Sequence, residues 1–122
     1  MGLKYDFSGV NRNYEAARVS FRQETPTDFN FAFDVIDDRA AKADKTALIC
    51  FDADGENRRD VSFSDLAQAS SRFGQALKRL GLVKGDYAAV IAGRVPEWHE
   101  VIFGCMKAGV ISMPSKYGGC CT

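Results

Sequence analysis

The sequence offers few side chains that could carry catalysis. His99 is the single histidine, and neither a cysteine nor a serine stands beside it. A Ser-His-Asp or Cys-His site would also need a marked nucleophile, such as the serine of a G-x-S-x-G elbow, and that motif does not occur. We therefore interpret His99 as a surface residue of a helix, and a triad assembled from distant residues is the weaker alternative.

Two pairs of acids are of the kind that binds calcium or performs general acid catalysis. Asp37 and Asp38 fall on the polar side of an amphipathic helical pattern. Asp52 and Asp54 lie in a turn-rich stretch that lacks the glycine and the twelfth-position glutamate at the spacing of an EF-hand loop. We interpret both pairs as solvated acids.

A phosphate-binding loop needs several glycines so that backbone amides can approach the anion. Neither G-x-G-x-x-G nor G-x-x-x-x-G-K-[ST] occurs in the sequence. The turn Lys84-Gly85-Asp86 is chemically able to touch a phosphate, but it stands between a helix cap and a strand. We interpret it as a connector.

The cysteines do not form a metal-binding pattern. Cys50 and Cys105 lie inside apolar runs, where a free cysteine behaves as a small buried hydrophobe. The pair Cys120-Cys121 has no second pair at zinc-ligand spacing and does not fit the C-a-a-X prenylation signal, although a double-cysteine variant of that signal is conceivable. Trp98 and Met106 fit an apolar helical stripe. The sequence therefore predicts no catalytic, cofactor-binding or metal-binding residue.

Composition is typical of one globular domain. The 122 residues are 46% hydrophobic and 26% charged, with formal net charge +0, so no net field attracts nucleic acid or anionic lipid. The basic pairs Arg58-Arg59 and Lys78-Arg79 are interpreted as solvated surface. No apolar run is long enough to cross a bilayer as a helix, and residues 1–6 lack a signal-peptide run. We predict a cytoplasmic protein with no membrane or nucleic-acid partner.

The first half of the chain predicts an arm, a helix and a hairpin. Residues 1–28 mix aromatic and polar residues at no sustained period, and are interpreted as an arm along a larger body. A helical face follows, with Asn30 as its cap. Strands are expected at 46–51 and 58–63, with a turn between them. The predicted helical face consists of Phe29, Phe33, Ile36, Ala40 and Ala43.

The second half predicts a βαβ unit preceded by a helix. The apolar stripe Leu66, Ala69, Phe73, Leu77 and Leu80 indicates a helix capped by Ser64 and ended by Gly81. The runs 87–92 and 110–113 are typical of strands covered on both faces, and a helix begins between them at Pro96. We predict an α/β fold with a partial parallel or mixed sheet, flanking helices and a right-handed crossover.

An ordered series of short motifs resembles a known family. It comprises Val61-Ser62-Phe63-Ser64-Asp65-Leu66, Leu80-Gly81-Leu82-Val83-Lys84-Gly85-Asp86, Val95-Pro96-Glu97-Trp98, Met106-Lys107-Ala108-Gly109-Val110 and Met113-Pro114. In this order they resemble the amino-terminal part of AMP-forming acyl-CoA synthetases, within the adenylate-forming family. The stretch Phe29-Asn30-Phe31-Ala32-Phe33-Asp34-Val35 is similar to the medium-chain branch of these enzymes.

The resemblance implies that residues 29–114 are an incomplete amino-terminal part of the large AMP-binding synthetase domain, about the first fifth of a typical member. Residues 115–122 depart from the family as a divergent tail, so the strand at 111–113 is expected to lose sheet neighbours and covering helices and to expose apolar faces. The family's phosphate loop ending in lysine, its nucleotide contacts and its acyl pocket all lie beyond the matching stretch. No catalytic residue can therefore be carried over, and no cofactor is expected to bind this fragment.

The resemblance also implies a parent reaction in fatty acid metabolism. A ligase of this kind uses ATP, Mg and CoA to convert a carboxylic acid to acyl-CoA, AMP and pyrophosphate. The fragment itself is predicted to be inactive scaffold. The alternatives are a non-catalytic interaction module that binds a partner through an exposed strand edge, and complementation by a separately encoded remainder.

Overall fold

The computed structural model describes residues 14–22 and 26–116. The described helices are α1 Tyr14–Ser20, η1 Ala32–Asp37, α2 Asp38–Lys42, α3 Phe63–Arg79 and α4 Pro96–Ala108. The described strands are β1 Thr46–Phe51, β2 Arg58–Ser62, β3 Tyr87–Ala92 and β4 Ile111–Lys116. This order confirms the predicted α/β class, with the strands arranged in two separate pairs.

β1 and β2 form the predicted antiparallel hairpin, with Phe51 opposite Arg58 and Leu48 opposite Val61. Gly55 has a φ of 75° in the connecting turn, a conformation that L side chains rarely adopt. The side chain of Asp52 accepts hydrogen bonds from the backbone of Glu56, at 3.0 Å, and from the side chain of Asn57. These bonds lower the pKa of Asp52, so this acid stabilises a turn.

α3 begins two residues earlier than predicted, and Ser62 rather than Ser64 is its cap. Ser62 Oγ accepts the Asp65 amide at 3.1 Å, and the Asp65 carboxylate accepts the Ser62 amide at 3.0 Å. This reciprocal capping box needs an acceptor three residues after the cap, which Ser62 has. The amide of Ser64 instead donates to Asp44 Oδ1 at 3.2 Å.

Replacing Ser62 with alanine should lower the free energy of unfolding by about 1 kcal/mol, because the Asp65 amide loses the hydroxyl oxygen that accepts its hydrogen bond. Urea unfolding followed by circular dichroism measures this loss. Ser62→Thr keeps a hydroxyl cap and is the matched control, which should stay near the parent value. Equal stability of the alanine and threonine variants would contradict the assignment of the cap.

The carboxyl end of α3 confirms the stop predicted at Gly81. The amide of Leu82 donates to Leu77 O at 3.1 Å, and that of Gly81 donates to Lys78 O at 3.0 Å. This Schellman arrangement places Gly81 at φ 90°, which glycine adopts without a steric penalty. Leu82 then packs beside the buried Leu77 and directs the chain toward β3.

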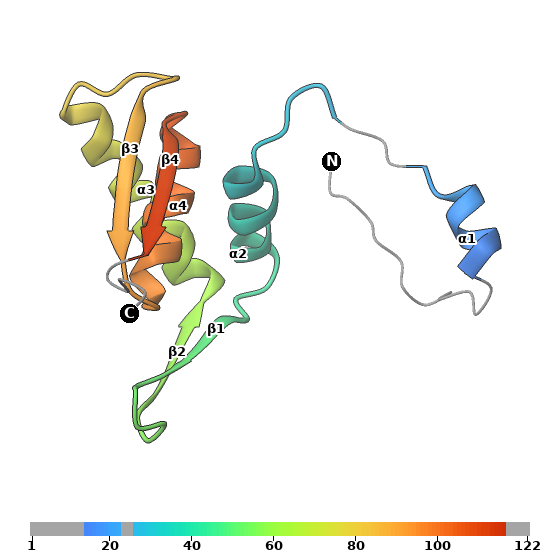
Figure 1. Cartoon of the computed structure of the whole chain (residues 1–122), viewed down its shortest axis with the longest axis horizontal. Coiled ribbons are helices and arrows are strands. Elements are labelled where there is room, and N and C mark those ends of the chain that lie inside the picture. Colours follow the sequence, from blue (N-terminus) through green and yellow to red (C-terminus); the bar gives the residue numbers. More distant parts are fainter. Residues whose placement is uncertain (1–13, 23–25, 117–122) are drawn as a thin grey trace, which may run out of the picture.

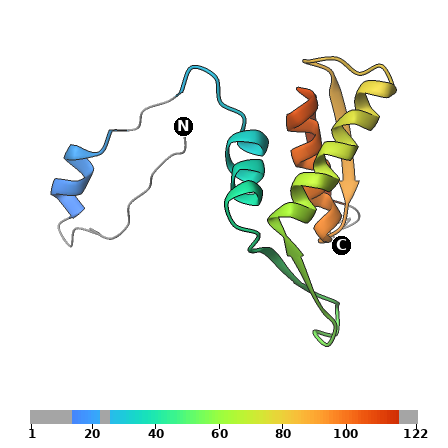
Figure 2. The ribbon, with the colours of Figure 1, turned by 180° about the vertical axis from the view of Figure 1, so that it is seen from behind.

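β3 and β4 pair in parallel, with Tyr87 opposite Ile111, and α4 connects them as predicted. Figures 1 and 2 show α3 and α4 on one face of this pair and no labelled element on the other. The prediction that 87–92 is covered on both faces is therefore wrong for the part of the chain that the structure describes, whereas the apolar exposure expected at 111–113 is confirmed by Ile111 and Met113. Val90 is buried, whereas Tyr87 and Ile91 are exposed.

The core lies where α3 crosses α4 and where η1 meets the hairpin. Leu77, Cys105, Ala108 and Val110 form one buried cluster. Ile36, Val61 and Leu66 form the second cluster. Gly104 lies in the helix crossing, where an added Cβ would stand 2.9 Å from Ser70 O. The absence of a side chain there permits the close approach of the two helices.

The helix before the hairpin buries only part of the predicted face. Ile36 is buried as predicted, together with Ala32, whereas Phe29 and Phe33 are exposed. η1 is a π-helical turn, whose wider hydrogen-bond spacing rotates side chains away from the 3.6-residue pattern. The cap at Asn30 is confirmed, because its Oδ1 accepts the Ala32 amide at 3.0 Å.

The predicted arm, residues 1–28, contains a helix that the aperiodic pattern did not indicate. α1 stands apart from the other elements in both views (Figures 1 and 2). Phe21, just after it, is 61% exposed. Tyr5 and Phe7, two of the aromatic residues behind the prediction, lie outside the described residues.

Candidate functional site

A largely apolar pocket of about 620 Å³ lies at the carboxyl ends of β3 and β4. Ala92 and Ser115 bring the strand ends to it, Trp98 and His99 reach it from the first turn of α4, and Cys50 reaches it from β1. α4 begins there because Pro96 occupies its first position, where a missing amide hydrogen costs no helical bond. Carboxyl ends of parallel strands are common places for binding sites.

His99 is not the plain surface residue that the sequence predicted. Its ring is half-buried, 5.1 Å from the Trp98 ring in an edge-on arrangement and 6.3 Å from the Phe103 ring. In the described part of the chain, its Nδ1 is buried without a hydrogen-bond partner. A buried polar atom without a partner costs free energy, so a hydrogen-bonding group at this position would stabilise the fold. Cys50 and Ser115 line the same pocket, but among the described residues neither is bonded to His99 Nδ1, so no triad contact forms there.

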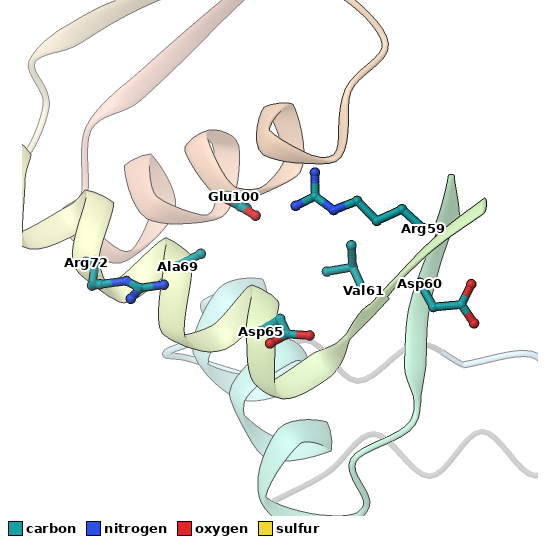
Figure 3. Close-up of a pocket in the computed structure, with 7 residues that line it drawn as sticks. All are labelled: Arg59, Asp60, Val61, Asp65, Ala69, Arg72 and Glu100. Carbon is teal, nitrogen blue, oxygen red and sulfur yellow. The ribbon is translucent and has the colours of Figure 1, made fainter. Parts of the chain in front are cut away.

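A second, polar hollow of about 320 Å³ lies between β2, α3 and α4. Its lining residues are Arg59, Asp60, Val61, Asp65, Ala69, Arg72 and Glu100 (Figure 3). Arg59 extends toward α4, whereas Asp60 points to the other side of the hairpin (Figure 3). Asp65 already serves the capping box. The hollow mixes both charge signs and presents no converging set for one ligand.

Arg59 links the hairpin to α4, although the sequence indicated only solvated surface. Its Nη1 lies 2.6 Å from Glu97 Oε1, with both side chains about half exposed. This hydrogen bond lowers the pKa of Glu97 and raises the pKa of Arg59. A pair this exposed is screened by salt and stabilises the fold only weakly.

The Arg59–Glu97 pair predicts a pH-dependent difference between the parent and Glu97→Gln. A carboxyl whose pKa is lowered by folding stabilises the folded state above its unfolded pKa, here 4.5, and this contribution is lost as pH falls through the folded pKa. Urea unfolding should therefore show a deficit for Glu97→Gln at pH 7 that shrinks as pH falls below 4.5 and disappears once pH is below the lowered pKa of Glu97. In an Arg59→Gln background, the same substitution should show no such pH dependence; a persisting dependence would refute the pair.

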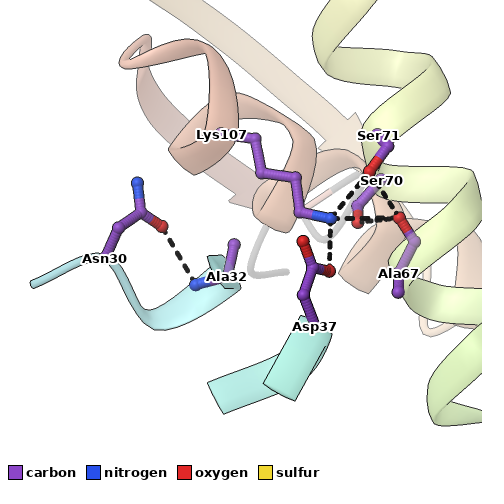
Figure 4. Close-up of polar contacts among 7 residues, drawn as sticks. All are labelled: Asn30, Ala32, Asp37, Ala67, Ser70, Ser71 and Lys107. Atoms are coloured by element: carbon purple, nitrogen blue, oxygen red, sulfur yellow. Dashed lines mark hydrogen bonds and ion pairs between the residues drawn. The ribbon is translucent and has the colours of Figure 1, made fainter. Parts of the chain in front are cut away.

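Lys107 is a buried cation that sequence reasoning did not single out. Its side chain is 4% exposed, and its Nζ lies 2.6 Å from Asp37 Oδ1. The same atom donates to Ala67 O at 3.0 Å and to Ser71 Oγ at 2.9 Å. Figure 4 shows α4 reaching η1 and α3 through this one ammonium group. All its protons have acceptors, so it serves as a structural tie.

Asp37 therefore differs from the solvated acid that was predicted, because it is half-buried and paired with Lys107. Asp38 pairs with Lys42 at 2.7 Å on the exposed side, as an acid on the polar face would. The two adjacent acids thus take different roles. The only sequence signal for the tie was Lys107 within an otherwise apolar helical run.

The turn at residues 84–86 is a connector, as predicted. The amide of Gly85 donates to Gly109 O at 2.9 Å, and the amide of Asp86 donates to Val83 O at 3.1 Å. Asp86 also places its carboxylate 2.7 Å from the Val83 amide. These amides are already used and an acid stands beside them, so the turn does not fit the phosphates of ATP or CoA.

The cysteines follow the prediction in part. Cys105 is fully buried, and this burial raises the pKa of its thiol, as expected of a buried hydrophobe. Cys50 is only half-buried, because it lies at the apolar pocket. Cys120 and Cys121 lie outside the described residues. Within residues 14–22 and 26–116, no three metal-ligating side chains gather, and no helix is long and apolar enough to span a bilayer.

Comparisons with known proteins find similarity to acyl-CoA synthetases and to a fatty acid AMP ligase. Acyl-coenzyme A synthetase ACSM2, a mitochondrial protein of Rattus norvegicus, is 41% identical over 99 residues, which cover 75% of this chain and 17% of that protein. The acyl-CoA synthetase of Brucella canis matches with a TM-score of 0.68 and 26% identity, covering 81% of this chain and 20% of that one. The fatty acid AMP ligase of Legionella pneumophila shares the fold, with a TM-score of 0.66 and 21% identity over 70% of this chain and 15% of that one.

This chain thus spans under a fifth of the rat relative it matches. A model of the AMP-binding enzyme family matches residues 36–118, from η1 to just beyond β4. That segment is well over half of the 122 residues. The chain therefore belongs to the AMP-binding enzyme family.

Proposed function

We propose that this chain is the amino-terminal scaffold of an AMP-forming acyl-CoA synthetase domain. The observation that carries the proposal is the 41% identity to the rat acyl-coenzyme A synthetase over 99 residues, within a segment that matches the AMP-binding enzyme family. The fold supports it, since the same arrangement occurs in an acyl-CoA synthetase of which it covers 20%.

The complete enzyme would activate a carboxylic acid with ATP, using Mg, and release pyrophosphate as the acyl-adenylate forms. Coenzyme A would then take the acyl group and release AMP. We propose that residues 14–22 and 26–116 hold none of these cofactors; in the 84–86 turn, the amides of Gly85 and Asp86 are already bonded to backbone carbonyls. Their contribution is a framework: Lys107 fixes α4 against α3 and η1, and α4 sets the position of the β3–β4 pair.

We propose that the chain alone is inactive. Purified chain incubated with ATP, Mg²⁺, CoA and a panel of straight-chain, branched and aromatic carboxylic acids should release no pyrophosphate above the protein-free blank. The rat ACSM2 synthetase serves as the positive control. Acid-dependent pyrophosphate release by the isolated chain would overturn this part of the proposal.

The competing proposal is a non-catalytic module that binds a partner through a strand edge. It is favoured by the two-stranded β3–β4 sheet, in which each strand has only one neighbour among the described residues. Sedimentation velocity distinguishes the synthetase scaffold from an independent binding module. A sharp folded monomer would favour the independent module, whereas slow association would favour an incomplete domain.

The cytoplasmic compartment remains a prediction, and the rat relative is named as a mitochondrial protein. The acyl substrate class is likewise proposed only as a small carboxylic acid.

A further inference from the structure

The face of the β3–β4 sheet that points away from α3 and α4 is apolar and exposed. Tyr87 and Ile91 are 66% and 64% exposed, and Ile111 and Met113 are 45% and 47% exposed. The register places Tyr87 beside Ile111 and Ala89 beside Met113, so these side chains share one side of the sheet. We call this set, with Ala89, the outer sheet face.

Such a surface is unusual for a parallel pair. Parallel sheets are normally covered on both faces, and an isolated pair of strands is at best marginally stable. The helices on the inner face leave the outer sheet face without a neighbour among the described residues (Figures 1 and 2). We therefore expect a further polypeptide to cover this face with strands and with the apolar sides of helices.

The apolar pocket extends this surface at the strand ends. Ser115, which lines the pocket, is the register partner of Ile91 on the outer sheet face. His99 contributes the buried Nδ1 that lacks a partner in the described residues. A covering polypeptide that extends over the strand ends could therefore also supply the missing hydrogen-bond partner.

We propose that the outer sheet face is the docking surface for the polypeptide that completes a synthetase domain. The proposal rests on the proposed function, because the occupant is inferred from the relatives' length. The chain covers 17% of the rat synthetase and 20% of the Brucella canis synthetase, so most of the domain in those proteins lies outside the matched part. β4 leads the chain out of the described fold directly beside this face.

Co-expression tests the surface. The affinity-tagged chain is produced with the portion of rat ACSM2 that follows its aligned 99 residues, and the amount of that portion that co-purifies is measured. Ile91→Lys places a charge on the outer sheet face. Val83→Lys is the matched control, because Val83 is also 64% exposed but lies in the loop before β3. Circular dichroism checks that both variants fold like the parent.

The parent and Val83→Lys should recover the synthetase portion equally, and Ile91→Lys should recover at least about tenfold less, because a lysine would be buried without a partner. Failure of the parent to recover it, or equal recovery with Ile91→Lys, would overturn the proposal. A homodimer of the chain alone that Ile91→Lys dissociates would assign the face to a second copy and also overturn it. Pyrophosphate release by the recovered complex is scored separately: docking without activity would contradict only the proposed function.

Discussion

Replacing Lys107 with alanine is expected to lower the free energy of unfolding by about 3 kcal/mol, the largest loss we predict for a single polar side chain. The substitution leaves the half-buried carboxylate of Asp37, 2.6 Å from Nζ in the parent, without its cation. It also removes the donor to Ala67 O and Ser71 Oγ. We take the lower end of the range for broken buried pairs because Asp37 is 33% exposed. Urea unfolding followed by circular dichroism measures the loss.

Lys78→Ala is the matched control for this prediction. Lys78 is exposed in the last turn of α3, and its loss should change stability by less than about 0.5 kcal/mol. A double variant, Asp37→Leu with Lys107→Met, should recover most of the stability, because apolar residues can replace a buried ion pair. A Lys107→Ala variant as stable as Lys78→Ala would show that the buried tie does not hold the helices together.

Gly104→Ala is expected to destabilise the chain by about 2 kcal/mol. Alanine normally improves a helix interior by up to about 1 kcal/mol relative to glycine. Here the new Cβ would stand 2.8 Å from Phe73 Cδ1 and 2.9 Å from Ser70 O. The carbonyl belongs to the backbone of α3 and cannot rotate away, so α3 and α4 must separate. Thermal and urea unfolding both report the change.

Gly93→Ala tests whether the effect comes from crowding. A Cβ at Gly93 would meet no atom within 4 Å, and its φ is not in the left-handed region. We expect this variant to unfold at the same temperature and urea concentration as the parent. A gain in stability for Gly104→Ala would mean that helix propensity outweighs the contact, and the close crossing of α3 and α4 would be wrong.

Local patterns predicted most of the fold. The α3 stripe, the glycine at its end, the turn of the hairpin and Pro96 at the start of α4 all act within a few residues, so the sequence carries their signals directly. The cap shifted from Ser64 to Ser62 because two serines precede Asp65 and only the reciprocal bond distinguishes them. The π-helical turn changed which residues within 32–37 are buried, which a 3.6-residue template cannot represent.

Long-range features could not be predicted in the same way. Lys107 and Asp37 are 70 residues apart, and each alone fits an exposed helix position. The orphaned Nδ1 of His99 depends on Trp98 and Phe103 packing around it. The apolar pattern of β3 indicates two covered faces, but Tyr87 and Ile91 are exposed; only the exposure of the strand at 111–113 was expected, from the divergent tail. An apolar strand face that is exposed in the described residues is expected when further polypeptide normally covers the sheet.

A covalent chimera tests the central claim most directly. Residues of this chain replace the 99-residue segment that they match in rat ACSM2, and acid-dependent pyrophosphate release is measured beside the isolated chain and the rat enzyme. We predict activity in the chimera, because the matched segments should serve the same scaffold role, and none in the isolated chain. A folded chimera that releases no pyrophosphate, or an isolated chain that does, would contradict the account.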